Sequence, residues 1–326
     1  MGSDADGWRP TATMSTLQLR AAMLARARGY FAGTGALEVE TPALVRAPVT
    51  DVHLESLRVT DDVTHTTQGF LQTSPEYGMK RLLCAGAPDI YQVCRVFRAA
   101  ERGRRHNPEF TMIEWYRLGI DDHALMRDVE GFVRTMLEPH REMAPSDFTS
   151  YQRAFERVLE IDPLHAPLMQ LRNAIEQRGV PVPESMRTQS SRDDLLDLAM
   201  STLVAESFAR DRLTFVSDFP PSQAALARVR GEVAARFEAF WGPAELANGF
   251  HELGVADEQR ARFESDRAER RPAGQPDREP DRHFIEALQV GLPDCAGVAL
   301  GFDRLLMVAI EAERIDDVIA FPFERA

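Results

Sequence analysis

The segment Asp89–Leu118 constrains this chain most, because it joins two apolar runs through a strongly basic loop. The runs are typical of β-strands. The first ends in Arg98, and the second opens with Phe110 and carries Glu114. Arginine can form paired hydrogen bonds to a phosphate, and a phenylalanine can stack on a base. This hairpin therefore suits a nucleoside triphosphate, and the competing interpretation is a surface hairpin with a charged tip. The basic loop contains Arg102, Arg104, Arg105 and His106.

The bulk composition is that of a globular protein with an acidic balance. The 326 residues are 44% hydrophobic and 27% charged, with a formal net charge of −13. This charge argues against broad affinity for nucleic acid, which needs many cations against phosphates. Three cysteines without metal-like spacing indicate reduced thiols, and no apolar run could cross a bilayer. We expect a cytoplasmic protein that does not associate with membranes.

The order of elements predicts an α+β fold rather than a doubly wound parallel sheet. Residues 1–14 are expected to be a disordered lead-in, and 15–326 one domain with an insertion at about 140–212. Residues 271–282 have the composition of a mobile loop. No Gly-rich phosphate loop of the Walker or Rossmann type is present, so any ATP must be bound by arginines on a sheet surface. Predicted helices are Ser15–Ala32, Ser74–Gly86, Asp122–Leu137, Leu168–Arg178, Glu258–Arg270 and Phe302–Glu313. Predicted strands are Ala36–Leu44, Thr214–Asp218, Gly231–Phe240, Ala247–Leu253 and Ala296–Leu300, with a hairpin at Val49–Thr67 turning at Asp61 and Asp62.

Two further segments carry candidate site residues. Glu238–Leu253 contains Glu238, Glu245, Asn248 and Glu252, whose carboxylates could hold Mg²⁺ or a cationic substrate. The alternative is a set of solvated glutamates. Gly297–Leu306 is a Gly-rich strand that leads into a helix with Asp303 and Arg304 in its first turn. Arg304 could reach distal phosphates; alternatively, Asp303 favours the helix dipole and Arg304 is solvated.

Three of these segments resemble motifs 1, 2 and 3 of the class II aminoacyl-tRNA synthetases, in that order. They are Gly35–Leu44, Phe97–Trp115 and Gly297–Leu306. The lysyl-tRNA synthetases are the most similar subgroup, because Thr73–Leu83 and Glu245–Leu253 also match. The resemblance implies the class II catalytic fold, which is a mixed, largely antiparallel sheet flanked by helices. It also implies a homodimer that pairs through residues 36–44.

The resemblance assigns roles to matching positions. Arg98 and Arg304 would be the catalytic residues, at the α- and γ-phosphates of ATP. Glu76 would face the substrate amino group near its carboxylate, and Glu252 would face the ε-ammonium of lysine. The implied ATP ligands are Arg98, His106, Asn107, Phe110, Glu114, Glu245 and Arg304. The implied substrate ligands are Glu76, Tyr116, Asn248, Glu252, Ala299 and Gly301. The implied Mg²⁺ ligands are Glu238 and Glu245.

The N-terminal side of the motifs holds too few residues for the OB-fold that reads the anticodon in lysyl-tRNA synthetases, so no anticodon-dependent tRNA binding is expected. A truncated paralogue of this kind resembles the elongation factor P lysine ligases. That resemblance implies activation of lysine, preferably (R)-β-lysine, with ATP and Mg²⁺, and transfer to a lysine of elongation factor P. Alternatives are an enzyme that acylates tRNA or a small molecule, and a non-catalytic lysine-binding regulator.

Two positions depart from the usual family pattern. Ala299 stands where a lysyl-tRNA synthetase commonly has glycine, and its methyl group is a hint of β-lysine preference; alternatively, it is a neutral packing choice. The family pattern Phe-Arg-x-Glu is here Phe97-Arg98-Ala99-Ala100, followed by Glu101. Either Glu101 substitutes for the absent carboxylate from one residue further on, or the acceptor geometry differs.

Overall fold

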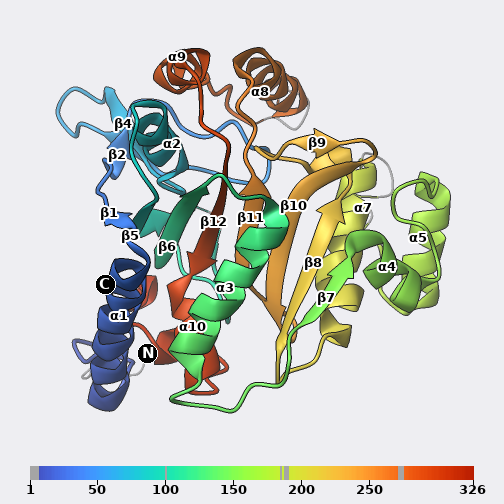
Figure 1. Ribbon diagram of the computed structural model, residues 1–326, viewed down its shortest axis with the longest axis horizontal. Coiled ribbons are helices and arrows are strands. Elements are labelled where there is room, and N and C mark those ends of the chain that lie inside the picture. The colour runs from blue at the N-terminus through green and yellow to red at the C-terminus, as the bar shows by residue number, and fades with distance from the viewer. Residues whose placement is uncertain (1–6, 100, 184–185, 187–190, 271–274) are drawn as a thin grey trace.

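The computed structural model describes residues 7–99, 101–183, 186, 191–270 and 275–326. Within these ranges the main sheet has nine strands, in the order β1-β5-β6-β12-β11-β10-β8-β7, with β9 paired to β10 (Figure 1). The β1–β5 and β7–β8 pairs are parallel and the others are antiparallel. The predicted α+β class with a mixed, largely antiparallel sheet is therefore confirmed. The strands are β1 Leu37–Glu38, β5 Ile90–Phe97, β6 Glu109–Leu118, β7 Asp147–Ser150, β8 Leu213–Phe219, β9 Val229–Arg230, β10 Val233–Trp241, β11 Ala244–His251 and β12 Cys295–Gly301.

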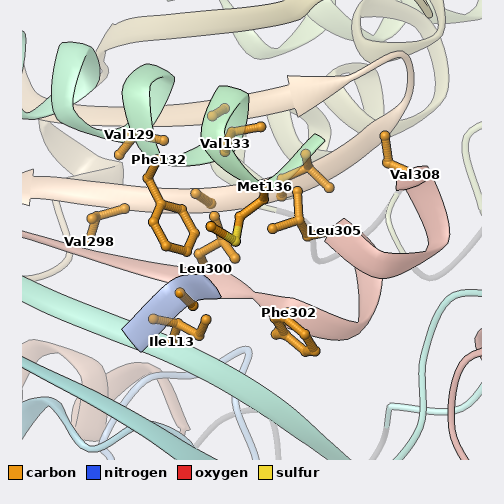
Figure 2. Close-up of a cluster of buried hydrophobic side chains, with 14 of the residues drawn as sticks. Ile113, Val129, Phe132, Val133, Met136, Val298, Leu300, Phe302, Leu305 and Val308 are labelled. Carbon is orange, nitrogen blue, oxygen red and sulfur yellow. The ribbon is translucent and has the colours of Figure 1, made fainter. Parts of the chain in front are cut away.

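One face of this sheet is apolar and covered by helices. Directly opposed residues on neighbouring strands share a face. The pairing of β5, β6, β12, β11 and β10 thus aligns a row of apolar side chains. Helices α1 (Met14–Thr34), α3 (Asp122–Leu137) and α10 (Phe302–Ala309) cover this row. In Figure 1, α3 and α10 cross the near side of the sheet, and Figure 2 shows their buried side chains against it. The row is Val93, Ile113, Leu300, Ala247 and Ala239.

Helix α3 is an example of how the sequence sets this packing. Asp121 caps its start by accepting a hydrogen bond from the backbone N–H of Ala124 at 2.8 Å. Val129, Phe132 and Val133 then recur at helical spacing, and all three are fully buried (Figure 2). The predicted range Asp122–Leu137 is therefore confirmed.

The opposite face of the sheet is covered only at its two ends. At one end lie α2 (Glu76–Cys84), α8 (Ala256–Arg270) and α9 (Arg282–Val290), and α2 packs against α9. At the other end lie α4 (Tyr151–Leu159), α5 (Leu168–Gln177) and α7 (Arg192–Ala199), which form a second apolar cluster with β8 and β10 (Figure 1). The chain continues from α7 through a π-turn, Met200–Val204. The middle of this face is left for a site.

The small three-stranded sheet corrects two predictions. The predicted strand Ala36–Leu44 is only β1 and, beyond Pro42, β2 (Leu44–Val45). The predicted hairpin Val49–Thr67 is instead β3 (Arg58–Thr60) and β4 (Thr67–Leu71). Its turn is longer than expected, because the Asp61 side chain accepts hydrogen bonds from the backbone of Val63 and Thr64.

The segment predicted as an insertion is closely joined to the main sheet. Strand β7 pairs in parallel with β8, so part of residues 140–212 completes the sheet edge. The predicted helix Leu168–Arg178 is confirmed as α5, which ends one residue earlier. Residues 184–185 and 187–190 of this segment, and 271–274 of the loop expected to be mobile, lie outside the described residues.

Candidate active site

A polar row crosses the middle of the sheet on the other face, and its members Gln92, Glu114 and Glu238 are buried. It lies one residue along from the apolar row, and alternation along each strand therefore turns it to the opposite face. Buried oxygens of two of its amides, Gln92 Oε1 and Asn248 Oδ1, have no hydrogen-bond partner within the described residues. Buried polar atoms are usually paired, so these two oxygens mark space for a polar ligand. The row is Gln92, Glu114, Ala299, Asn248 and Glu238.

Glu114 lies at the centre of a buried hydrogen-bond network. Tyr116 Oη donates to Glu114 Oε1 at 2.7 Å, and Ser74 Oγ donates to Glu114 Oε2 at 2.6 Å. Burial raises the pKa of Glu114 to about 7, and the neighbouring Glu76 carboxylate adds to this, despite the two hydrogen bonds. A buried carboxylate beside a second one favours a cationic partner.

A second carboxylate pair surrounds a lysine at the same end of the cleft. Lys80 Nζ donates to Glu76 Oε1 at 2.6 Å and lies 2.5 Å from Glu252 Oε2. Glu76 and Lys80 are four residues apart and share one face of α2. Burial raises the pKa of Glu252 to about 8, although Lys80 acts to lower it. Three carboxylates thus converge on one small volume.

Gly297 lets these groups pack closely against β12. It lies opposite Tyr116 on β6 and Phe250 on β11. A Cβ atom at this position would lie 2.3 Å from the Tyr116 ring and 2.5 Å from Glu252 Oε1. No larger residue fits without moving both side chains. The Tyr116 ring and Glu252 Oε1 therefore occupy the place that a side chain at position 297 would take.

The other end of the cleft is basic. Arg304 lies in the first turn of α10, and its guanidinium contacts His106 and Glu245. It donates to His106 Nε2 at 2.7 Å and to the Glu245 backbone carbonyl at 2.9 Å, and it lies 3.9 Å from Glu245 Oε2. Burial and the Arg304 charge lower the pKa of His106, so its ring is neutral and can accept the hydrogen bond.

Asp303 has a structural role beside it. Its Oδ2 accepts a hydrogen bond from the backbone N–H of Thr111 at 2.7 Å, and its Oδ1 pairs with Arg20 of α1. Asp303 is almost fully buried. These contacts fix the start of α10 against β6, so the backbone that carries Arg304 is held at the basic end.

Arg98 lies between the two ends. Its guanidinium donates to Glu101 Oε1 at 2.9 Å and to the Thr73 carbonyl at 3.4 Å, and it lies 5.1 Å from the centre of the Phe110 ring. Glu101, which directly follows the position of the missing motif 2 carboxylate, thus pairs with Arg98. Ala100 itself lies outside the described residues.

The residues predicted to hold Mg²⁺ form a close carboxylate pair. Burial raises the pKa of Glu238 to about 7, and Glu245 adds to this while Arg236 opposes it. Within the described part of the chain, no group of three or more histidine, cysteine, aspartate or glutamate side chains is arranged to hold a metal ion. A pair of carboxylates still suits Mg²⁺ when phosphate oxygens complete its coordination, as in many nucleotide sites.

Most of the predicted site residues therefore lie along this polar row or at its two ends. Ala299 occupies the polar row between Glu114 and Asn248. Asn107 is placed differently, because its amide donates to the Glu109 carbonyl and accepts from the backbone N–H of Phe323. Both ends of that amide are used within the protein, so Asn107 serves the C-terminal segment and we no longer include it among nucleotide ligands.

Two site residues were missed from the sequence. The sequence motifs assign no role to Lys80, although Lys80 follows Glu76 by four residues in a predicted helix and the two can therefore pair. Gly297 was passed over in favour of Gly301, where an added Cβ would meet nothing closer than 3.9 Å. The signal that could have found Gly297 was its place two residues before Ala299, on the same face of a predicted strand.

The cleft can bind a molecule with anionic groups at one end and amino groups at the other. Arginines accept phosphate and carboxylate oxygens, and three buried carboxylates accept ammonium groups. The hydroxyls of Ser74 and Tyr116 both donate to Glu114 and are held in this network. An end that accepts anions and an end that accepts ammonium groups favour a reaction between two bound substrates.

Comparisons with known proteins agree with this geometry. The family described as tRNA synthetases class II (D, K and N) matches residues 6–325. Relatives in Salmonella arizonae, Salmonella dublin and Salmonella enteritidis are each 46% identical over 330 aligned positions. Each match covers 99% of this chain and 100% of the relative, and each relative is named elongation factor P–(R)-β-lysine ligase. The chain therefore belongs to the class II tRNA synthetase family.

Proposed function

We propose that this chain activates lysine with ATP, preferably as (R)-β-lysine, and transfers it to a lysine side chain of elongation factor P. The observation that carries this proposal is the convergence of Glu76, Glu114 and Glu252 at one end of an arginine-lined cleft. A substrate with two ammonium groups satisfies these carboxylates, whereas a substrate with one would leave a buried charge unpaired, at a cost of several kcal/mol (order of magnitude). The names of the full-length relatives support the same substrate and acceptor.

In the first step the substrate carboxylate attacks the α-phosphorus of ATP. The new bond is an acyl–phosphate bond, and the bond to pyrophosphate breaks. Arg98 stabilises the charge at the α-phosphate, and Arg304 with His106 holds the distal phosphates, so positioning and electrostatics supply the catalysis. Phe110 stacks on adenine. Glu238 and Glu245 would hold Mg²⁺ that arrives with ATP, and the ion would neutralise phosphate charge.

In the second step the acceptor lysine reacts with the adenylate. Its uncharged ε-amine attacks the acyl carbonyl, an amide bond forms, and AMP leaves with the bonding electron pair. The proton of the amine must be released, and no side chain is assigned to take it. Ala299 lies between Glu114 and Asn248 in the polar row, which supports the proposal that its methyl group influences the amino-group position that is accepted.

We further propose that the chain works as a homodimer through residues 36–44. Leu37 and Leu44 are 51% and 48% exposed, which is unusual for leucines in ordered strands. Strand β1 ends the order of the main sheet, and β2 ends that of the small sheet. A second copy would cover both open edges.

The test is an incubation with ATP, labelled (R)-β-lysine or L-lysine, purified elongation factor P and total tRNA. The expected result is label on elongation factor P, with mass spectrometry locating one added lysyl group on a lysine. Label on tRNA would instead support a tRNA-acylating enzyme. Absence of lysine-dependent ATP–pyrophosphate exchange would support a non-catalytic lysine-binding protein. Equal or better use of L-lysine would contradict the β-lysine preference alone.

A further inference from the structure

Lys80 is chemically unusual in this chain. Of the 38 lysine and arginine residues, only residue 80 is a lysine. Its side chain is 0% exposed, in contrast to most lysines of globular proteins, which are on the surface. Every other basic position is an arginine, so the lysine at position 80 meets a local requirement. The ammonium of lysine is a compact point charge, whereas a guanidinium is planar and larger, so the two are not interchangeable between the closely spaced carboxylates of Glu76 and Glu252.

The surroundings of Lys80 hold its ammonium in place and keep it charged. Burial would lower the pKa of Lys80, but Glu252 and Glu76 outweigh it and raise the pKa above its ordinary value. The fully buried Phe284 ring of α9 lies 6.0 Å from Nζ. Lys80 is thus a permanent cation in the protein interior.

Glu252 presents its two oxygens to different neighbours. Its Oε2 lies 2.5 Å from Lys80 Nζ, and its Oε1 packs over Gly297 beside the Tyr116 ring. A substrate ammonium that contacts Oε1 would meet a carboxylate whose other oxygen already pairs with Lys80. The same carboxylate can then bridge a protein cation and a substrate cation.

Charge balance follows from this geometry. When Glu76, Glu114 and Glu252 are all ionised, these three carboxylates and the one ammonium of Lys80 leave a net charge of two negatives. Two substrate ammonium groups neutralise them, while the substrate carboxylate lies toward Arg98. Without Lys80, a diamino acid would leave one buried carboxylate uncompensated, which is costly.

We propose that Lys80 is a positioning and specificity-determining residue. Its ammonium neutralises one of the three carboxylates, so the remaining charge matches a substrate with two amino groups. This inference rests on the proposed function, because it concerns how the same pocket recognises lysine. Lys80 does not touch the reacting atoms and acts through Glu252 and Glu76.

The first experiment replaces the charge with a side chain of similar length. Lys80→Met is compared with Arg81→Met, which removes an exposed charge from the same helix. In lysine-dependent ATP–pyrophosphate exchange, Lys80→Met should raise the lysine KM at least about tenfold while the ATP KM changes less than about twofold, since one buried ion pair is lost at the amino-acid end only. Arg81→Met should change neither.

The pH profile separates positioning from a merely structural role. In the wild-type protein, the lysine KM should fall as Glu252 loses its proton and should level off above about pH 8. In Lys80→Met, Glu252 lacks its nearest cation, so the fall should continue to higher pH. An unchanged lysine KM and pH profile would overturn the proposal. The titratable groups that face Glu252 are Lys80, Glu76, Glu114, Tyr116 and Cys295.

A second measurement does not depend on the variant folding. Because the chain has one lysine, protein labelled with [ε-¹³C]lysine has a single lysine side-chain signal in NMR. Unlabelled lysine should shift this signal, whereas norleucine, which lacks the second amino group, should not. No shift at saturating lysine, in a sample active in exchange, would overturn the proposal. A wild-type sample without lysine-dependent exchange would instead contradict the proposed function itself.

Discussion

At the scale of single residues, the cleft is divided by charge. Arg98 and Arg304 are both about one-fifth exposed, so they are open to ligands from the cleft. Each is also held by protein groups, Arg98 by Glu101 and Arg304 by His106. Arginines that are already oriented lose less conformational freedom when a phosphate binds.

Loss of Arg98 should therefore remove chemistry rather than stability. We expect Arg98→Ala to lower the rate of lysine-dependent ATP–pyrophosphate exchange by about 10²–10³-fold, which is typical for the loss of one oriented charge-stabilising donor. Thermal unfolding should change little. Arg102→Ala in the same loop is the matched control, because Arg102 is 57% exposed and points toward Glu324 and Phe323. Normal exchange in Arg98→Ala would contradict the proposed mechanism.

The buried carboxylates give lysine binding a defined pH dependence. The pKa of Glu252 is raised to about 8 and that of Glu114 to about 7. Below these values the carboxyl groups hold protons and pair poorly with ammonium. We therefore expect the lysine KM to rise as pH falls from 8 to 6, while the ATP KM changes less. Steady-state exchange at each pH measures both. In Glu252→Gln, binding should be weak throughout, and the part of the trend near pH 8 should disappear.

The sequence was informative about residues with direct roles and less so about their supports. Arg98, Glu114, Glu252 and Arg304 stand in blocks that resemble a family, and the structure brings them around one cleft. Lys80 looks like a surface lysine of a helix, because the groups that bury it, Glu252 and Phe284 of α9, come from segments much later in the chain. Asn107 looked like a ligand because it follows His106, yet its partner is a backbone N–H at position 323. Both cases depend on contacts that are distant in sequence.

At the scale of elements, strand alternation builds the site. A one-residue step along β6 moves from Ile113 in the core to Glu114 in the cleft, and the same step on β12 moves from Leu300 to Ala299. Helix and long-strand positions followed from local periodicity. The two-residue strands β1 and β2 did not, because their pairing with β5 and β4 exists only after the chain has folded.

Two glycines of β12 should behave differently when a methyl group is added. In Gly297→Ala the new Cβ would overlap the Tyr116 ring and Glu252, so we expect the lysine KM to rise by at least about tenfold as these groups shift. Gly301→Ala is the matched control, since its φ of −74° suits alanine and its nearest neighbour is 3.9 Å away. Kinetics of exchange with varied lysine measure both. Equal effects of the two substitutions would contradict the assignment of Gly297 as the position where only glycine fits.

At the scale of the whole molecule, one face of the main sheet forms the hydrophobic core and the other carries the candidate site. Helices α1, α3 and α10 cover one face and form the main core, while helices at both ends of the other face frame the cleft. The described helices are all too short or too polar to span a lipid bilayer. The end strands β1 of the main sheet and β2 of the small sheet each carry a half-exposed leucine. Open strand edges with apolar side chains are usually covered in stable proteins.

In the proposed homodimer a second copy would cover strands β1 and β2, and this can be tested directly. We expect the wild-type chain to have twice its monomer mass of 36.6 kDa in light scattering after size-exclusion chromatography. Replacing both Leu37 and Leu44 by arginine should raise the dimer dissociation constant by about two orders of magnitude or more, because two charges would have to be buried at the contact. Val63→Arg is the control for added charge, since Val63 is 88% exposed in the turn between β3 and β4. A monomeric wild-type chain that is active at the same concentration would contradict the dimer while leaving the cleft and its chemistry untouched.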